Sequence, residues 1–349
     1  MSGLPTAWVF WVFARGHMRT GMRGWFVRGM GCSAWILLLA AVFATPVWAQ
    51  KAGGKDKEKD KEKFDPVVRS LETRDGGTLK GTYFQSNRGK DASVVVLLHM
   101  ADGNRMIWQG KESFAARLQN EGYAVLTLDL RGHGDSKGDG AVAAAAQSDK
   151  KTARKAARKI EYQQMVEFDM EAVNRFLLAE HQLEHLNMNK TAFVGPEMGA
   201  TIASFAALRD WQKPRYDDAP AGSGMETPRG ENVRALILIS PIQNLQGLNI
   251  AAPLKPLSDP RLGVAFMVAV AQKDKEDKGQ AKKTYEQIAT LPRSDERMYY
   301  REYPGAFRGT ELLGKKTKLE EHMLVFLNKH LRDLEIPWTD RRPADEREK

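Results

Sequence analysis

Cysteine is almost absent from this chain. Cys32 is the only cysteine among 349 residues, and it precedes the apolar run Ala34–Trp48. A lipoprotein acceptor cysteine would have to follow that run, and a disulfide would need a second thiol. The part of the chain after the run therefore has no thiol, disulfide or cysteine-linked lipid anchor. This composition suits an oxidising compartment such as a periplasm.

The apolar run has the length of a secretory signal's hydrophobic region and is short for a membrane span. Arg-bearing residues 1–31 precede it, and Val47-Trp48-Ala49 places small residues at the two positions that specify signal cleavage. We expect a signal peptide at 1–49, cleavage after Ala49, and export to the periplasm or outside the cell. The alternative is an uncleaved segment that anchors the protein in a membrane. The long N-terminal region leaves four candidate translation starts: Met1, Met18, Met22 and Met30.

The positive net charge does not indicate nucleic-acid binding. Residues 1–49 carry four Arg and no acidic residue, so removing them lowers the net charge from +9 to +5. What remains has no basic stripe interleaved with base-stacking aromatics, and we expect no nucleic-acid partner. Residues 50–63 are almost free of apolar side chains, with six Lys against four acidic residues. They predict a disordered charged linker.

The pattern from residue 64 to 335 predicts one α/β domain, with 336–349 as a C-terminal tail. Continuous β-branched runs such as Ser93–His99 are typical of strands buried on both faces of a parallel sheet, and Asp75-Gly76-Gly77 is typical of a hairpin turn. The other expected strands are Val67–Leu71, Thr78–Phe84, Tyr123–Leu130, Val233–Ser240, Val264–Ala271 and Met298–Tyr303. The expected helices are Ser113–Gln119, Tyr162–Glu180, Ala281–Ala289 and Lys318–Leu331.

Residues 138–160 interrupt this alternation. Gly138–Lys159 is first Ala-rich and then basic, a composition that favours a helical insertion. Because it follows the carboxyl end of an expected strand, where α/β sheets place ligands, we expect it over the entrance of the site. Its basic face either contacts a membrane surface transiently or is simply solvated.

The central motif is Gly195-Pro196-Glu197-Met198-Gly199, within Thr191–Ala207. An apolar strand, a Gly-flanked turn and an Ala-rich helix follow one another there. This stretch resembles the nucleophile elbow G-x-S-x-G of the α/β-hydrolase superfamily, which includes serine hydrolases, lysophospholipases and dienelactone hydrolases. Glu197 stands where that family has its serine. Asp129–Ser136 is similar to the family's D-x-R-G-H-G-x-S turn, in which we expect His133 to be structural.

A second stretch resembles the family's sequence around the catalytic histidine. Pro304–Leu313 fits P-G-A-x-H-G-T-x-L-L at nine of ten positions, and Arg308 replaces the histidine. The family's acid is matched by Asp274, with Asp277 as a close substitute. The family's oxyanion loop is matched by His99-Met100-Ala101-Asp102, so the backbone donors would come from Ala101 and Met198, against which the Glu197 carboxylate would lie.

The resemblance implies a hydrolase fold that lacks the residues needed for serine-hydrolase catalysis. A carboxylate at 197 is a poor nucleophile, and Arg308 cannot accept a proton. We expect a pseudo-hydrolase in which Glu197, Arg308 and Asp274 form an ion triad, and which binds an unknown small molecule or protein without a cofactor. The alternative is an active carboxylesterase, lipase or peptidase-like hydrolase with an unrecognised nucleophile. His181-Gln182-Leu183-Glu184-His185 matches the zinc pattern H-x-x-E-H, but it straddles an expected helix end, so we expect no metal.

Overall fold

The computed structural model describes residues 64–137, 151–220, 222–290, 296–314 and 317–347. These residues belong to one compact unit, Lys57–Lys349. The expected signal peptide, the charged linker and residues 138–150 of the insertion lie outside the described residues.

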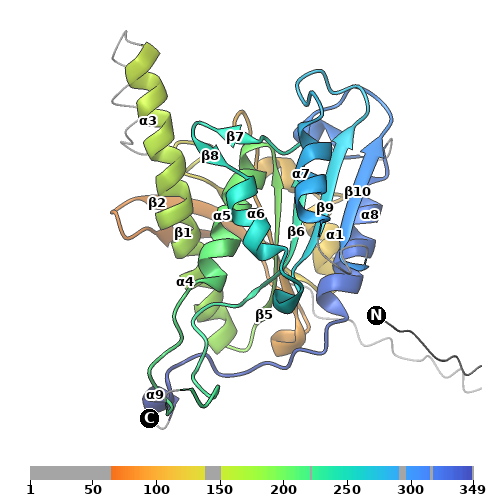
Figure 1. The fold of residues 1–349 in the computed structure, drawn as a ribbon. Helices are drawn as coiled ribbons and strands as arrows, with labels where there is room; N and C mark the ends of the chain where they lie inside the picture. The colour runs from red at the N-terminus through yellow and green to blue at the C-terminus, as the bar shows by residue number, and fades with distance from the viewer. Residues whose placement is uncertain (1–63, 138–150, 221, 291–295, 315–316, 348–349) are drawn as a thin grey trace, which may run out of the picture. The chain divides into compact units, whose positions relative to one another are not determined.

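The fold is built on an eight-stranded, mostly parallel sheet, which confirms the α/β class (Figure 1). The strand order is β1-β2-β4-β3-β5-β6-β9-β10. Strand β2 pairs antiparallel with β1 and β4, and all other neighbours in the sheet are parallel. The strands are β1 Val67–Glu72, β2 Thr78–Phe84, β3 Ser93–Leu97, β4 Ala124–Asp129, β5 Asn187–Pro196, β6 Val233–Ile239, β7 Asn244–Leu245, β8 Leu248–Asn249, β9 Ala265–Ala271 and β10 Met298–Tyr303.

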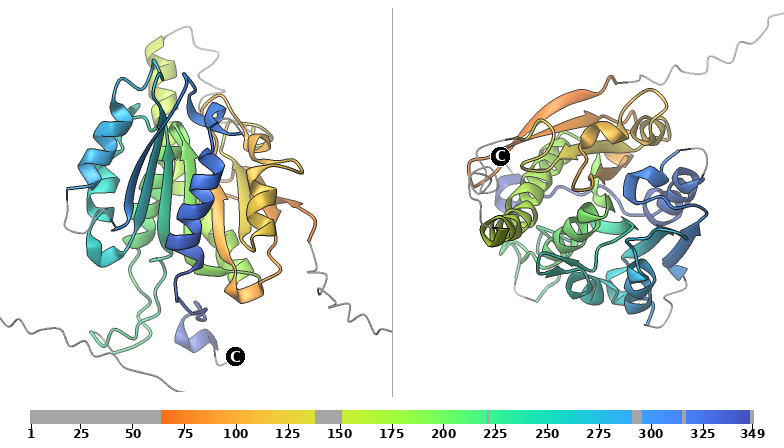
Figure 2. Two further views of the ribbon diagram at one scale, coloured as in Figure 1. Left: turned by 90° about the vertical axis from the view of Figure 1, so that its right-hand side faces the viewer. Right: turned by 90° about the horizontal axis from the view of Figure 1, so that it is seen from above.

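Helices cover both faces of the sheet, and alternation along the strands divides the core in two (Figure 2). In β3, Val94 and Val96 belong to the core under α4, α5, α6 and α7, whereas Val95 and Leu97 belong to the core under α1 and α8. Both faces of β3 are therefore buried, as its unbroken β-branched run predicts. The helices are α1 Phe114–Asn120, α3 Lys151–Gln164, α4 Met170–Gln182, α5 Met198–Trp211, α6 Ala251–Leu257, α7 Gln280–Ile288, α8 Leu319–Leu327 and α9 Ala344–Arg347.

The helix expected over Tyr162–Glu180 is not a single regular helix. A π-helical turn, Met165–Asp169, separates α3 from α4. Within it, the buried Asp169 accepts hydrogen bonds from the backbone N–H and the Nε of Arg131, at 3.0 and 2.7 Å. The guanidinium of Arg131 also reaches Asp75 in the β1–β2 turn. A single π-helical turn between two α-helical segments is the usual form of a π-bulge. Hydrophobic spacing alone does not predict it.

Helix α3 is the described part of the expected insertion, and it projects beyond the carboxyl edge of the sheet (Figure 1). Lys159 lies beside Gly247 in the turn between β7 and β8, a hairpin that the sequence did not predict. The insertion is therefore helical over Lys151–Gln164 and lies at the sheet edge expected for it.

The C-terminal segment does not leave the domain at residue 335. Trp338 stacks on His181 with ring centroids 4.9 Å apart and donates its indole N–H to the His181 carbonyl at 3.0 Å. Arg341 is buried and donates to Asn232 at 2.7 Å. Further along, the N–H of Ala344 donates to Asp218 at 3.0 Å, and Arg347 donates to Thr227. The expected tail at 336–349 thus contacts the domain as far as Arg347, because its side chains have partners that only the fold provides. In the described residues, no helix combines the length and apolarity needed to span a membrane.

We predict that Trp338→Ala lowers the free energy of unfolding by about 1–2 kcal/mol, since it removes an aromatic pair and a hydrogen bond at a half-buried position. Denaturant unfolding followed by circular dichroism measures the effect. Met225→Ala, at a side chain that is 72% exposed, is the control and should change stability by less than about 0.5 kcal/mol. Equal stability of the Trp338 variant and the wild type would mean that the segment is not part of the domain.

Candidate functional site

The site is organised by the sharp turn between β5 and α5. Glu197 occupies this turn with φ 48° and ψ −109°, a backbone conformation that non-glycine residues rarely adopt. Its N–H donates to the carbonyl of Ile239 at the end of β6, at 2.8 Å. The side chain of Glu197 is consequently lifted out of both elements at the carboxyl edge of the sheet.

Gly195 and Gly199, on either side of Glu197, are required because backbone atoms approach them too closely for a side chain. A Cβ on Gly195 would lie 2.2 Å from the carbonyl carbon of Gly199, and a Cβ on Gly199 would lie 2.8 Å from the His99 carbonyl oxygen. Backbone occupies both places, so no side chain fits without moving an element. The glycine spacing seen in the sequence thus has a steric cause: it lets the first turn of α5 lie against β5 and against the end of β3.

Three sequence-predicted residues come together at this turn. Nε of Arg308 forms an ion pair with Oε1 of Glu197, and Nη1 of Arg308 donates to Oδ2 of Asp274 at 3.0 Å. The side chains are 16%, 10% and 2% exposed for Arg308, Glu197 and Asp274. The buried Nε meets Glu197 as a charge contact and lacks the direction of a hydrogen bond. The Glu–Arg–Asp arrangement expected from the sequence is present in the structure.

Each member of the triad is held by its own loop. Asp274 follows β9 and accepts the backbone N–H groups of Glu276 and Asp277, at 2.9 and 3.2 Å. The loop after β10 is fixed where Gly309 donates its N–H to the hydroxyl of Ser240, at 3.1 Å. Ser240 directly follows β6, has φ 46° and is fully buried. The sequence analysis missed Ser240, since a serine at a strand end gives no distinctive signal.

Asp277, the substitute considered for the acid, has a different role. Its carboxylate accepts the N–H groups of Gly279 and Ala281, both at 2.9 Å, at the start of α7. It is therefore a helix-capping residue, and Asp274 alone occupies the acid position.

Carboxylates outnumber cations at the triad. A third one, Glu276, lies 3.4 Å from Nε of Arg308, although its side chain is 76% exposed. Burial raises the pKa of Glu197, and the charges of Glu276 and Asp274 add to this while Arg308 opposes it. Burial opposes the charge on Arg308, but Glu197 and Asp274 outweigh it and raise the pKa of the guanidinium further above its ordinary value. Arg308 is thus a permanent cation.

The oxyanion loop differs from its sequence-based expectation. The carboxylate of Glu197 pairs with Arg308, and none of the hydrogen bonds among described residues joins it to the N–H of Ala101 or Met198. Instead, the sulfur of Met100 lies 3.1 Å from the hydroxyl of Thr310. The expected contact of Glu197 with the Ala101 and Met198 donors is not among these hydrogen bonds, and the carboxylate has a guanidinium as its charged partner instead.

The two histidines near the site are engaged in loop structure. His99 is fully buried, donates from Nδ1 to the Met100 carbonyl at 2.8 Å and accepts the Leu130 N–H at Nε2 at 3.0 Å. Burial lowers the pKa of His99 to about 4, so its ring is neutral at pH 7. His133 lies 4.9 Å from the His99 ring, and its Nδ1 is 2.8 Å from the Arg131 carbonyl. Neither ring contacts Glu197 by any described hydrogen bond.

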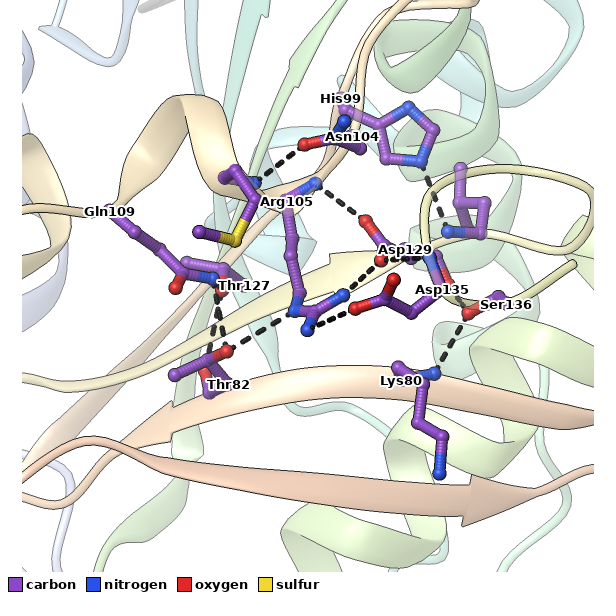
Figure 3. A network of polar contacts seen from close by, with 12 residues as sticks. Lys80, Thr82, His99, Asn104, Arg105, Gln109, Thr127, Asp129, Asp135 and Ser136 are labelled. Carbon is purple, nitrogen blue, oxygen red and sulfur yellow. Dashed lines mark hydrogen bonds and ion pairs between the residues drawn. The ribbon is translucent and has the colours of Figure 1, made fainter.

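Behind the oxyanion loop lies a buried ion pair that the sequence analysis did not identify (Figure 3). Asp129, fully buried, pairs with the guanidinium of Arg105 and accepts its backbone N–H at 2.6 Å. It also accepts the N–H of Asp135 at 2.9 Å. Gly134 is required here, since a Cβ would lie 2.2 Å from the Asp129 carboxylate. The D-x-R-G-H-G-x-S turn is thus a structural device that fixes the loops beside the site.

The two histidines of the H-x-x-E-H segment are bonded to other protein groups. His181 is buried and bonded to the carbonyl of Thr339 at 2.8 Å, while His185 pairs with Glu180 at 2.8 Å. Across the described part of the chain, no three His, Cys, Asp or Glu side chains are grouped to hold a metal.

Comparison with known proteins supports the fold that the turn around Glu197 indicates. A family model described as the alpha/beta hydrolase fold matches residues 93–305, which is more than half of the chain and includes the elbow and Asp274. The chain belongs to the α/β-hydrolase fold family. No curated protein sequence matches this α/β-hydrolase.

Solved structures resemble this α/β-hydrolase in fold at low sequence identity. The protein DcsB, solved in complex with a substrate analogue, matches with a TM-score of 0.52 and 14% identity, over 76% of this chain and 100% of that one. An acylaminoacyl peptidase of Pyrococcus horikoshii matches with a TM-score of 0.50 and 13% identity, over 80% of this chain and 44% of that one. An esterase of Pyrococcus furiosus has a TM-score of 0.49 and 13% identity, over 77% and 92%.

We predict a favourable coupling energy between Glu197 and Arg308. Arg308→Met should lower the free energy of unfolding by about 3–5 kcal/mol, because it strands two buried carboxylates. In a double-mutant cycle with Glu197→Gln, the expected coupling is about 1–3 kcal/mol. Glu276→Gln is the control, since its exposed carboxylate should contribute less than about 1 kcal/mol. A coupling energy near zero would show that the pair does not stabilise the site.

A second prediction compares two carboxylates that share Arg105. Asp129→Asn should destabilise the protein by about 3–5 kcal/mol, because Asp129 is fully buried and its loss leaves Arg105 without its buried counter-charge. Asp135→Asn removes a carboxylate that is 68% exposed, 2.8 Å from the same guanidinium, and should cost about 1 kcal/mol or less. Urea unfolding of both variants measures the difference, and equal effects would contradict the structural role assigned to Asp129.

Proposed function

We propose that this α/β-hydrolase-fold protein is a non-catalytic pseudo-hydrolase that acts by binding a small molecule or another protein. The observation that carries the proposal is the position of Arg308. Its guanidinium occupies the place of the general base and lies between Glu197 and Asp274. A general base must accept a proton, and a guanidinium with a raised pKa cannot do so at physiological pH.

Glu197 is equally unsuited to the nucleophile's role. Aspartate nucleophiles exist in the superfamily, among dehalogenases and epoxide hydrolases, but they need a histidine that activates water. Here the carboxylate is neutralised by Arg308, and both nitrogens of His99 are already used in hydrogen bonds. A covalent ester formed at Glu197 would have no adjacent base to complete its hydrolysis.

The competing proposal is an active carboxylesterase, lipase or peptidase-like hydrolase with a different nucleophile. It is supported by the names of the similar structures, which include an esterase and a peptidase. The hydroxyl of Ser240 adjoins the loop that carries Arg308, but Ser240 is fully buried and accepts the Gly309 N–H. A nucleophile needs an accessible hydroxyl and a neighbouring base, so the geometry favours the non-catalytic proposal.

We predict that the purified protein is not labelled by a fluorophosphonate probe and does not hydrolyse short-chain p-nitrophenyl esters above the rate of the heated protein. Intact-mass spectrometry and absorbance at 400 nm are the measurements. Stoichiometric labelling that a single Ser→Ala change abolishes would overturn the pseudo-hydrolase proposal. Ser240→Ala is the first variant to compare in that case.

The double variant Glu197→Ser/Arg308→His tests the same proposal from the other side. It restores the family's nucleophile and base on an elbow whose backbone is already bent, and Asp274 remains to orient the histidine. We expect weak esterase activity that Glu197→Ala/Arg308→His lacks. If the restored variant folds and stays inactive, the Met100–Thr310 contact in the oxyanion loop is the next element to replace.

We also propose that the protein is exported, with cleavage near Ala49, and that the basic insertion contacts anionic surfaces only transiently. The support is the Arg-flanked apolar run and the small residues before Gln50. Intact-mass analysis of the exported protein should give a chain that begins at Gln50. A mature chain that retains the apolar run would instead favour the membrane-anchored form.

A further inference from the structure

A cavity of about 270 Å³ lies between α4 and α5, away from the triad. Its walls include Met188 and Thr191 at the beginning of β5 and Val233 at the beginning of β6. Glu197 follows the other end of β5, nine residues after Met188 and six after Thr191. The cavity therefore belongs to the amino edge of the sheet and is distinct from the candidate site at the carboxyl edge.

The cavity is lined by apolar side chains and by the uncharged polar residues Asn174, Thr191, Gln212 and Asn232. Its lining includes Val166, Met170, Val173, Leu177, Met188 and Phe193, all of which belong to the buried core of that face. The one buried carboxylate beside it, Asp210, is already saturated by the N–H groups of Asn232 and Val233 and the side-chain amide of Asn232. The interior thus offers a ligand apolar contact and no free charge.

The rim of the cavity carries opposite charges on its two sides. Helix α4 and the turn before it contribute Glu167 and Glu171, and α5 and its end contribute Arg209 and Lys213. Glu171 and Lys213 close one pair across the rim at 3.0 Å. Glu167 and Arg209 each lie four residues earlier, are exposed, and are joined by no ion pair within the described residues.

Glu167 and Arg209 line the cavity from its α4 side and its α5 side, nearer the carboxyl edge of the sheet than the closed pair. Helices α4 and α5 precede and follow the parallel strand β5, so both run from the carboxyl edge to the amino edge of the sheet. Glu167 lies in the π-helical turn before α4, and Arg209 lies in the last turn of α5. We call Glu167 and Arg209 the open pair.

We propose that this cavity binds a free amino acid with an apolar side chain. The ammonium group meets the Glu167 carboxylate, the carboxylate meets the Arg209 guanidinium, and the side chain enters the apolar interior. A volume of about 270 Å³ is more than tenfold the ~10–15 Å³ that a cavity needs to hold one water molecule. That volume accommodates an amino acid such as leucine or phenylalanine.

The charges select a zwitterion over a simple acid or amine. A fatty acid would satisfy Arg209 and leave its apolar chain beside an unpaired Glu167, and an alkylamine would leave Arg209 without a partner. Only a ligand with both charges next to each other completes both sides of the open pair, with the charge-assisted hydrogen bonds that each side can form.

Isothermal titration calorimetry of the mature protein with L-leucine and L-phenylalanine tests the proposal. We expect saturable binding of both, weakened about tenfold or more for L-leucinamide and for N-acetyl-L-leucine, each of which lacks one charge. Two results overturn the proposal: no heat of binding with leucine at millimolar concentration, or affinities for the two derivatives equal to that of leucine.

Variants assign each charge to its partner. Arg209→Gln should remove the preference for leucine over leucinamide, and Glu167→Gln should remove the preference for leucine over N-acetyl-leucine. Arg261→Gln is the matched control, because this exposed arginine pairs only with Asp259, two residues away, and does not line the cavity. Retention of full selectivity by both rim variants, with unchanged circular dichroism, would place leucine elsewhere and refute the assignment.

Discussion

The approach of α5 to β5 at the turn around Glu197 is the constraint on which the site depends. Gly195 and Gly199 have backbone where a Cβ would be, so the helix begins directly against the strand and against the end of β3. The resulting backbone conformation of Glu197 is strained, and its N–H bond to Ile239 helps to hold it. Any residue at this position is presented to the loops that follow β9 and β10.

The geometry of the turn explains why charge complementarity matters here. A carboxylate at 197 is forced into a place that is only 10% exposed, where an uncompensated charge is costly. Arg308 compensates it from the loop after β10, and Asp274 holds Arg308 from the other side. Loss of Arg308 would leave both carboxylates buried and unpaired. The same reasoning applies to Arg105 behind the oxyanion loop. Its buried partner Asp129 is expected to contribute to stability, whereas its exposed partner Asp135 is expected to contribute little.

The two ends of β5 serve different chemistry. At the carboxyl end, the ion pair of Glu197 and Arg308 lies at the turn that resembles the family's nucleophile elbow. At the amino end, the packing of α4 on α5 leaves a cavity whose rim has one closed and one open charge pair. The Glu197–Arg308 pair is satisfied within the chain, whereas Glu167 and Arg209 form no ion pair within the described residues.

The sequence by itself determined the sheet, the elbow, and Glu197 and Arg308 as two members of the triad. Continuous β-branched runs, the Asp75-Gly76-Gly77 turn and the spacing of Gly195 and Gly199 are local signals, and each reports a steric or burial requirement within a few residues. Only the tertiary structure decided which carboxylate faces Arg308, since Asp274 and Asp277 are three residues apart and indistinguishable in pattern. It also decided the π-helical turn at Met165–Asp169, the packing of Trp338 on His181, and the cavity rim. These features depend on partners distant in sequence, and a pattern read along the chain carries no information about which distant side chain will be there.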